Sequence, residues 1–131
     1  MNWTIEFTPD FSREAKILSK RYKSFKDDLK DFKDSIIKNP FQGTEIFPGI
    51  RKIRMPIAAK GKGKSGGARV ITLTFYVSEE EGAVKFLIIY DKSDADTVDV
   101  KVVRSIVKDL GFDLELLWQE DRLKEKKQTN N

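Results

Sequence analysis

The sequence of 131 residues contains neither cysteine nor histidine. Without cysteine, disulfide bonds and thiolate metal sites are excluded. Without histidine, the chain also lacks the commonest metal ligand and the commonest general base of enzymes. We therefore expect no metal and no other cofactor, and any proton transfer has to use another type of side chain.

Long apolar runs are absent as well. No stretch approaches the roughly 18 apolar residues that would indicate a membrane span. The first residues show no basic segment followed by an apolar one, so we expect no signal peptide. The expected location is the cytoplasm, with no membrane partner. With 39% apolar and 35% charged residues, the composition is typical of a folded globular domain.

Acidic residues are missing from one internal stretch, residues 46–78. The basic residues of that stretch are Arg51, Lys52, Arg54, Lys60, Lys62, Lys64 and Arg69. Because the net charge of the whole chain is only +4, the rest of the chain is net acidic. A local excess of positive charge is expected for a surface that binds a polyanion such as a nucleic acid.

Hydrophobic periodicity predicts the secondary structure. Apolar residues alternate with polar ones, or run continuously, in the expected strands, and recur every three or four residues in the expected helices. We expect residues 41–49 to form a loop because of their glycines and proline. The expected strands are 3–7, 51–55, 68–77 and 83–90, and the expected helices are 11–18, 22–36 and 98–110.

This order, β-α-α-β-β-β-α, predicts an α+β fold in which helices pack on one face of a mainly antiparallel sheet. The two N-terminal helices should form a hairpin on that sheet. Residues 83–90 are almost wholly apolar and are expected to form the central strand. We expect one domain over residues 1–111, followed by a C-terminal extension, residues 112–131, that is partly frayed.

Residues 60–67 have the unusual sequence Lys-Gly-Lys-Gly-Lys-Ser-Gly-Gly. This is not a P-loop, because Ala58 stands where the motif requires its first glycine, and a strand is expected to follow instead of a helix. Glycines allow the backbone to approach phosphate oxygens closely. Arg54 and Arg69 can make bidentate contacts with phosphate. We therefore interpret this region as a clamp for RNA.

The predicted RNA contacts include two tyrosines, which could stack on unpaired bases. Packing within the sheet explains each tyrosine at least as well. The predicted RNA-binding residues are Arg51, Lys60, Lys62, Lys64, Tyr76 and Tyr90.

Three blocks of the sequence resemble the RelE/HigB toxins of type II toxin–antitoxin pairs, within the RelE/ParE superfamily. The blocks are residues 51–54, 60–71 and 89–93, and the order of elements is similar from about Ile5 to Leu110. The resemblance implies a RelE-like fold and an endonuclease that enters the ribosomal A site and cuts mRNA there, inhibiting translation. It also implies a cognate antitoxin protein as a partner.

Cleavage of this kind needs no metal. The 2′-hydroxyl attacks the neighbouring phosphate, a base and an acid move protons, and positive charge stabilises the phosphorane. In the absence of histidine, lysine is the candidate proton-transfer group, because arginine keeps its proton. The resemblance assigns the catalytic positions to Lys52, Arg54, Arg69 and Lys92. Ser93 departs from the family pattern, because some relatives carry an arginine there and a catalytic tyrosine after it.

Two alternatives remain open at this point. One is a non-catalytic RNA- or ribosome-binding module on the same fold, which the departure at Ser93 would explain. The other is a ParE-like toxin that acts on DNA gyrase and would provoke a DNA-damage response in place of mRNA cleavage.

Overall fold

The computed structural model describes residues 1–61 and 66–112. Within these ranges the chain forms five strands, three α-helices and a short 3-10 helix, so the expected α+β class is confirmed. In chain order the elements are β1 (Asn2–Phe7), α1 (Pro9–Arg21), α2 (Phe25–Lys38), β2 (Thr44–Phe47), β3 (Ile50–Met55), the 3-10 helix η1 (Ala58–Lys60), β4 (Ala68–Tyr76), β5 (Glu81–Asp91) and α4 (Val100–Asp109).

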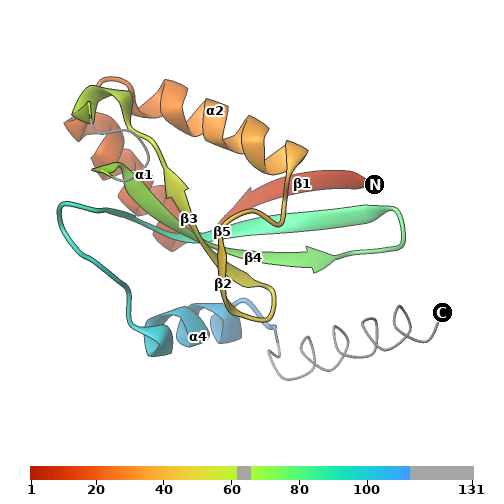
Figure 1. Ribbon diagram of the computed structural model, residues 1–131. Coiled ribbons are helices and arrows are strands. Elements are labelled where there is room, and N and C mark those ends of the chain that lie inside the picture. The colour runs from red at the N-terminus through yellow and green to blue at the C-terminus, as the bar shows by residue number, and fades with distance from the viewer. Residues whose placement is uncertain (62–65, 113–131) are drawn as a thin grey trace.

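The strands form one mixed sheet in the order β1-β5-β4-β3-β2 (Figure 1). β1 runs parallel to β5, whereas the other three neighbouring pairs are antiparallel. β5 pairs on both of its sides, as expected for its apolar sequence. The sheet therefore has two edge strands, β1 from the start of the chain and β2 from its middle.

The expected loop at residues 41–49 is wrong in part, because Thr44–Phe47 forms the edge strand β2. The chain turns from β2 into β3 at Gly49, whose φ of 83° lies in the left-handed region that glycine adopts without strain. Ile46 and Phe47 pack against buried side chains on the sheet, which holds β2 in place. The observed order of elements is accordingly β-α-α-β-β-β-β-α.

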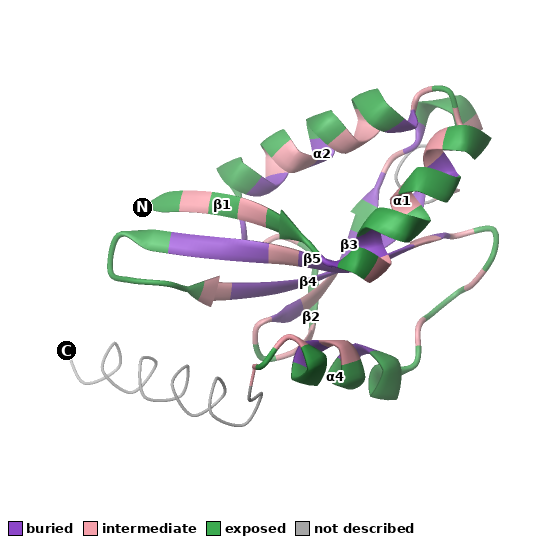
Figure 2. Ribbon diagram, turned by 180° about the vertical axis from the view of Figure 1, so that it is seen from behind, coloured by how far each residue is buried: buried purple, intermediate pink, exposed green. Residues whose placement is uncertain are grey.

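Helices cover both faces of the sheet, which corrects the expectation of a single helical layer (Figures 1 and 2). On one face, Phe11 of α1 and Phe32 of α2 pack against Phe86. On the opposite face, Val103 of α4 belongs to the same buried cluster as Leu87. Neighbouring residues of a strand point to opposite faces, so the apolar β5 needs a cover on each side.

The start of α1 is fixed to the sheet by Thr8. Its Oγ1 accepts a hydrogen bond from the Phe11 amide at 3.0 Å and donates one to the Leu87 carbonyl at 2.8 Å. Pro9 follows as the first helical residue, a position where the missing N–H of proline has no effect. This cap and the buried stripes of α1 and α2 place both helices on β5 and its neighbours.

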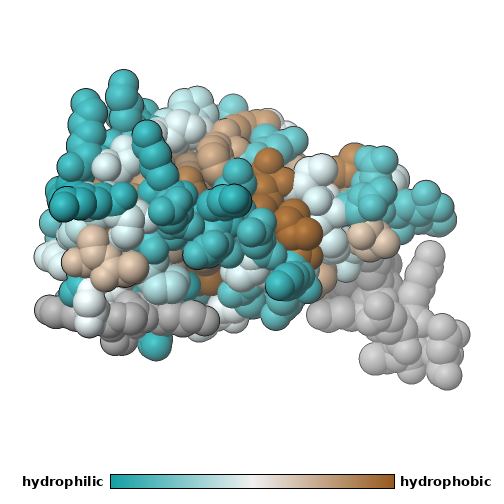
Figure 3. Space-filling model, turned by 90° about the horizontal axis from the view of Figure 1, so that it is seen from above, coloured by the Kyte–Doolittle hydropathy of each residue, from teal (hydrophilic) through white to brown (hydrophobic). Residues whose placement is uncertain are grey.

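The outer surface of α1 and α2 is mostly hydrophilic, with apolar side chains gathered near the middle of this view (Figure 3). No helix in the described ranges has both the length and the apolar character to cross a membrane. Phe112, the last described residue, packs against Phe75 with ring centroids 4.9 Å apart. The predicted domain boundary at residue 111 and the C-terminal extension stay predictions, because residues 113–131 lie outside the described part of the chain.

Candidate functional site

A row of polar side chains crosses three adjacent strands at one end of the sheet. Arg54 of β3 is the direct cross-strand partner of Arg69 of β4, and Arg69 is in turn the partner of Tyr90 of β5. Lys52 lies two residues before Arg54, opposite Ile71, and so points to the same face of the sheet. The register therefore brings residues from distant parts of the chain onto one surface.

This surface lies on the α4 face of the sheet, beyond the area that α4 covers. α4 packs over Ile71 and Leu73, whereas Arg69 comes one same-face position earlier in β4. On β3, Arg54 alternates with the buried residues Ile53 and Met55, as predicted from the sequence. The end of the sheet that α4 leaves uncovered is thus basic, with Arg54 exposed and Arg69 only 7% exposed, its Nη1 donating to the Ala68 carbonyl at 3.2 Å.

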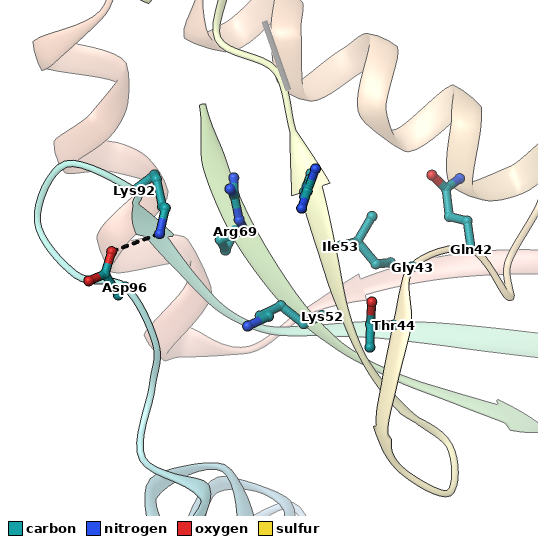
Figure 4. A pocket seen from close by; sticks show the side chains of 9 residues that line it. Gln42, Gly43, Thr44, Lys52, Ile53, Arg69, Lys92 and Asp96 are labelled. Carbon is teal, nitrogen blue, oxygen red and sulfur yellow. Dashed lines mark hydrogen bonds and ion pairs between the residues drawn. The ribbon is translucent and has the colours of Figure 1, made fainter. Parts of the chain in front are cut away.

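Lys52, Arg54 and Arg69 form part of the wall of an open cavity of about 610 Å³. Its walls come from the α2–β2 connection, from β3 and β4, and from the segment after β5, as Figure 4 shows. The lining includes all four residues predicted to be catalytic, namely Lys52, Arg54, Arg69 and Lys92. The structure therefore places these four together, although whether they catalyse a reaction stays a proposal.

Among the described residues, four cationic side chains and one carboxylate, that of Asp96, line the cavity. Lys92 Nζ donates a hydrogen bond to Asp96 Oδ1 at 2.7 Å, and this bond lowers the pKa of Asp96 below its usual value. Among the described residues, no carboxylate lies within ion-pair distance of Lys52 or Arg54. Like charges directly opposite each other in an antiparallel pair are unfavourable, so the Arg54–Arg69 pair favours a bound anion.

Tyr90 belongs to the same row, but its hydroxyl is buried and has no hydrogen-bond partner among residues 1–61 and 66–112. Burial raises the pKa of Tyr90, the charge of Arg69 opposes that rise, and the charge of Asp96 adds to it. The hydroxyl therefore stays protonated at neutral pH. The ring packs against the core beneath α4, a geometry that favours packing over the predicted stacking on a base.

Lys60 differs most from the sequence-based expectation. Its side chain is only 7% exposed, and its Nζ donates to Asp91 Oδ1 at 2.5 Å and to Ser93 Oγ at 2.9 Å. Lys60, which the sequence predicts as an RNA contact, is therefore engaged within the protein by Asp91 and Ser93. Because Asp91 ends β5, the contact ties η1 to the strand that leads directly into Lys92.

Asp91 receives donors from three further groups. Arg21 Nη1 lies 3.0 Å from its Oδ2 and the Tyr22 hydroxyl 2.5 Å from the same oxygen, while the Ser93 amide donates to Oδ1 at 2.9 Å. Burial acts to raise the pKa of Asp91, but the hydrogen bonds, led by that from Lys60, outweigh it and hold the pKa well below its usual range. Asp91 therefore stays ionised and joins the end of α1 to the segment that carries Lys92.

None of the four predicted RNA contacts among the described residues lines the cavity. Besides Lys60 and Tyr90, these are Arg51 and Tyr76. Arg51 points to the opposite face of β3, where its Nη2 pairs with Glu45 Oε2 at 2.7 Å. Tyr76 lies at the far end of β4, with its ring centroid 5.8 Å from that of Trp3. The remaining two predicted contacts, Lys62 and Lys64, lie outside the described residues.

Sequence analysis missed three polar side chains that line the cavity, namely those of Gln42, Thr44 and Asp96. Asp96 follows Lys92 by four residues, but this spacing is a useful signal only on a helix, and the segment is not helical. Gln42 and Thr44 belong to the region expected as a loop. They reach the cavity because β2 pairs with β3, and no local pattern indicates that pairing.

No protein-family model matches the chain. Among solved structures, the chain is similar to the E. coli toxin RelE, determined in the free state as a double arginine-to-alanine mutant. The two chains are 15% identical, with a TM-score of 0.49, and the similar region covers 73% of this chain and 90% of that one. At this level of similarity, function has to be argued from the residues around the cavity.

Proposed function

We propose that this chain is a RelE-like toxin that cleaves mRNA on the ribosome and so inhibits translation. One observation carries the proposal: four basic side chains from β3, β4 and the segment after β5 line a single cavity, whose described lining includes one carboxylate. The resemblance of residues 51–54, 60–71 and 89–93 to the RelE/HigB toxins supports the choice of RNA over other polyanions.

The arginine pair binds the phosphate of the RNA. Arg54 and Arg69 are cross-strand partners on adjacent strands, so their side chains lie next to each other on one face of the sheet. Arg69 is only 7% exposed and donates one hydrogen bond to the Ala68 carbonyl, so the exposed Arg54 makes the bidentate contact with the phosphate and Arg69 adds its charge and remaining N–H donors. A bound phosphate also relieves the repulsion between the two cations. The same contacts release counterions from the RNA, which makes the affinity dependent on salt.

The remaining side chains supply the proton transfers. Lys52 takes the proton of the 2′-hydroxyl, whose oxygen attacks the phosphorus while the bond to the next 5′-oxygen breaks, leaving a 2′,3′-cyclic phosphate. Arg54 and Arg69 stabilise the charge of the phosphorane. Lys92 gives a proton to the leaving 5′-oxygen after the substrate phosphate has replaced Asp96 as its partner.

The proposal includes a cognate antitoxin protein. An endonuclease that cuts mRNA during translation arrests the cell that produces it, so its activity has to be suppressed until it is needed. Lys60 is reassigned within the proposal, because it supports the site through Asp91, whereas Lys62 and Lys64 stay predicted RNA contacts.

Expression of this chain alone in a bacterium tests the proposal. We expect growth arrest together with new mRNA 5′ ends in phase with codons, detected by mapping transcript ends. Lys52→Ala and Arg54→Ala should abolish both effects, because Lys52 accepts the proton and Arg54 binds the phosphate. Neither side chain has an ion-pair partner among the described residues, so the two substitutions should not disturb folding.

Arg51→Ala is the matched control for these two variants. Arg51 lies on the same strand but points to the opposite face, toward Glu45, so its loss should leave growth arrest and cleavage intact. Normal growth of the wild-type strain, with no codon-phased ends, would contradict the proposal.

A non-catalytic RNA- or ribosome-binding module is the second candidate. It is favoured by the Lys92–Asp96 bond, which keeps the candidate acid engaged, and by Ser93 at a position where some relatives carry arginine. Ribosome binding without any cleavage, unaffected by Lys52→Ala, would support this candidate. A DNA-damage response in place of mRNA cleavage would instead indicate a gyrase-targeting toxin.

A further inference from the structure

A second cavity, of about 160 Å³, adjoins the one described above and lies between α2 and β3. Gln42 and Arg54 line both cavities. The two meet at the edge of the sheet, because β2 pairs with β3 only as far as Lys52 and leaves Arg54 on an unpaired edge. An RNA chain can therefore pass around this edge with its phosphate on one side and its base on the other.

The α2 side of this second cavity offers a carboxylate that is available to a ligand. Asp28 is already engaged, since its Oδ2 accepts hydrogen bonds from Ser24 Oγ at 2.6 Å and from the Ala58 amide at 3.1 Å. Asp31, almost one turn further along α2, also lines the cavity. Within the described residues, Asp31 takes part in no ion pair.

The other walls supply one further acceptor, a strong donor and an apolar surface. Gln42 uses its Nε2 to donate to the Ser35 carbonyl at 3.0 Å, which leaves its Oε1 to accept from a ligand. Arg54 carries five N–H donors, enough to serve a phosphate in the first cavity and a ligand in the second. Phe32, only 4% exposed, provides an apolar wall for a flat ring.

A guanine base matches this arrangement of groups. Its O6 and N7 atoms are acceptors that arginine binds in bidentate fashion, and its N1–H and 2-amino groups are adjacent donors for a carboxylate such as Asp31. Uracil presents a single N–H between two carbonyl oxygens, and those oxygens would face the Asp31 charge. The cavity therefore distinguishes guanine from uracil by the pairing of donors with acceptors.

We propose that the cavity formed by Asp31, Phe32, Gln42 and Arg54 binds a guanine base of the RNA whose phosphate lies against Arg54 and Arg69. This inference rests on the proposed function and adds a base preference to it. Asp31 is the residue that determines the preference, because its carboxylate is the group that uracil cannot satisfy.

Binding of three short RNAs to the full chain tests the inference. Each RNA has five nucleotides, is 2′-O-methylated to prevent cleavage, and carries uracils around a central guanine, hypoxanthine or uracil. Because the three have the same phosphates, any difference in affinity comes from the central base. We expect about tenfold tighter binding of the guanine RNA than of the uracil RNA, by fluorescence anisotropy, as a bidentate base contact would give. Hypoxanthine lacks the 2-amino group and should fall in between.

Asp31→Asn should reduce the preference for guanine to less than about twofold, a change well below the effect of one good base contact. Asp34→Asn is the matched control, since Asp34 lies on the same helix, is exposed and does not line the cavity. The control should keep the preference. A preference for guanine that survives Asp31→Asn would overturn the inference.

The remaining outcomes separate this inference from the proposed function. Equal, salt-dependent binding of all three RNAs would overturn the guanine site and leave the proposed phosphate-binding surface supported. Absence of binding for all three would contradict the proposed function, and the guanine site with it. Competition by free guanosine monophosphate at the same concentration as the guanine RNA would show a site for free nucleotides and overturn the assignment to RNA.

Discussion

Lys60 Nζ lies 2.5 Å from Asp91 Oδ1, and the two side chains are 7% and 0% exposed. The pair joins η1, at the entrance to the glycine-rich segment, to the last residue of β5. The Gly67 carbonyl, at the other end of that segment, accepts a hydrogen bond from the Lys92 amide at 3.0 Å. Both ends of the glycine-rich segment are thus attached to the strand end that carries Lys92.

Loss of one member of this pair should strongly destabilise the protein. Asp91→Asn leaves the Lys60 charge buried without its counter-charge, and breaking a buried ion pair from one side costs roughly 3–5 kcal/mol. We expect a correspondingly lower free energy of unfolding, measured by urea denaturation.

Asp10→Asn is the control for that measurement. Asp10 pairs with Arg13 at 2.9 Å, but the two side chains are 46% and 66% exposed, and exposed pairs contribute about 1 kcal/mol or less. Equal destabilisation by the two substitutions would show that burial does not increase the contribution of the Asp91 pair to the free energy of unfolding.

The stabilising effect of Asp91 should disappear in acid. Its pKa in the folded protein is held well below the usual range by its hydrogen bonds, although burial opposes them. A carboxyl group with a lowered folded pKa stabilises the protein above its unfolded pKa of about 3.9, and this contribution declines as the pH falls below that value. The difference in unfolding free energy between wild type and Asp91→Asn should therefore be constant from neutral pH to about pH 5 and shrink below about pH 4. A difference that stays constant down to pH 2 would contradict the assignment.

Removal of the carboxylate from the main cavity should strengthen RNA binding. Asp96 is the acidic residue among the cavity's described lining, and its bond to Lys92 competes with a substrate phosphate. Asp96→Asn should raise the affinity for a non-cleavable RNA, most clearly at low salt, where surface charges are least screened. Asp94→Asn is the control, because Asp94 pairs with Arg21 and does not line the cavity. Unchanged or weaker binding by Asp96→Asn would argue against competition at Lys92.

Affinity for RNA should fall steeply as the salt concentration rises, because each phosphate contact releases a counterion. Arg54→Ala, which removes a phosphate contact, should reduce the slope of log K against log salt by about 1. Arg51→Ala should leave the slope unchanged, because Arg51 points away from the cavity and pairs with Glu45. A flat salt response of the wild type would contradict phosphate binding at this surface.

Local sequence patterns determined most of the elements and the face on which the basic residues of β3 lie. Helical periodicity located α1, α2 and α4, since the buried stripe of a helix repeats every three to four residues. Strand alternation put Lys52 and Arg54 on one face of the strand and Ile53 on the other, because successive side chains point to opposite faces. These properties depend on residues close together in the chain.

The tertiary structure alone decided which residues meet. Strand alternation does not determine which strands pair or in what register, so the row of Arg54, Arg69 and Tyr90 follows only from the long-range pairing of β3, β4 and β5. For the same reason the sequence did not reveal that Lys60 is buried against Asp91, 31 residues away. A lysine at the start of a glycine-rich segment looks exposed, and only the packing of distant segments supplies the carboxylate that pairs with it.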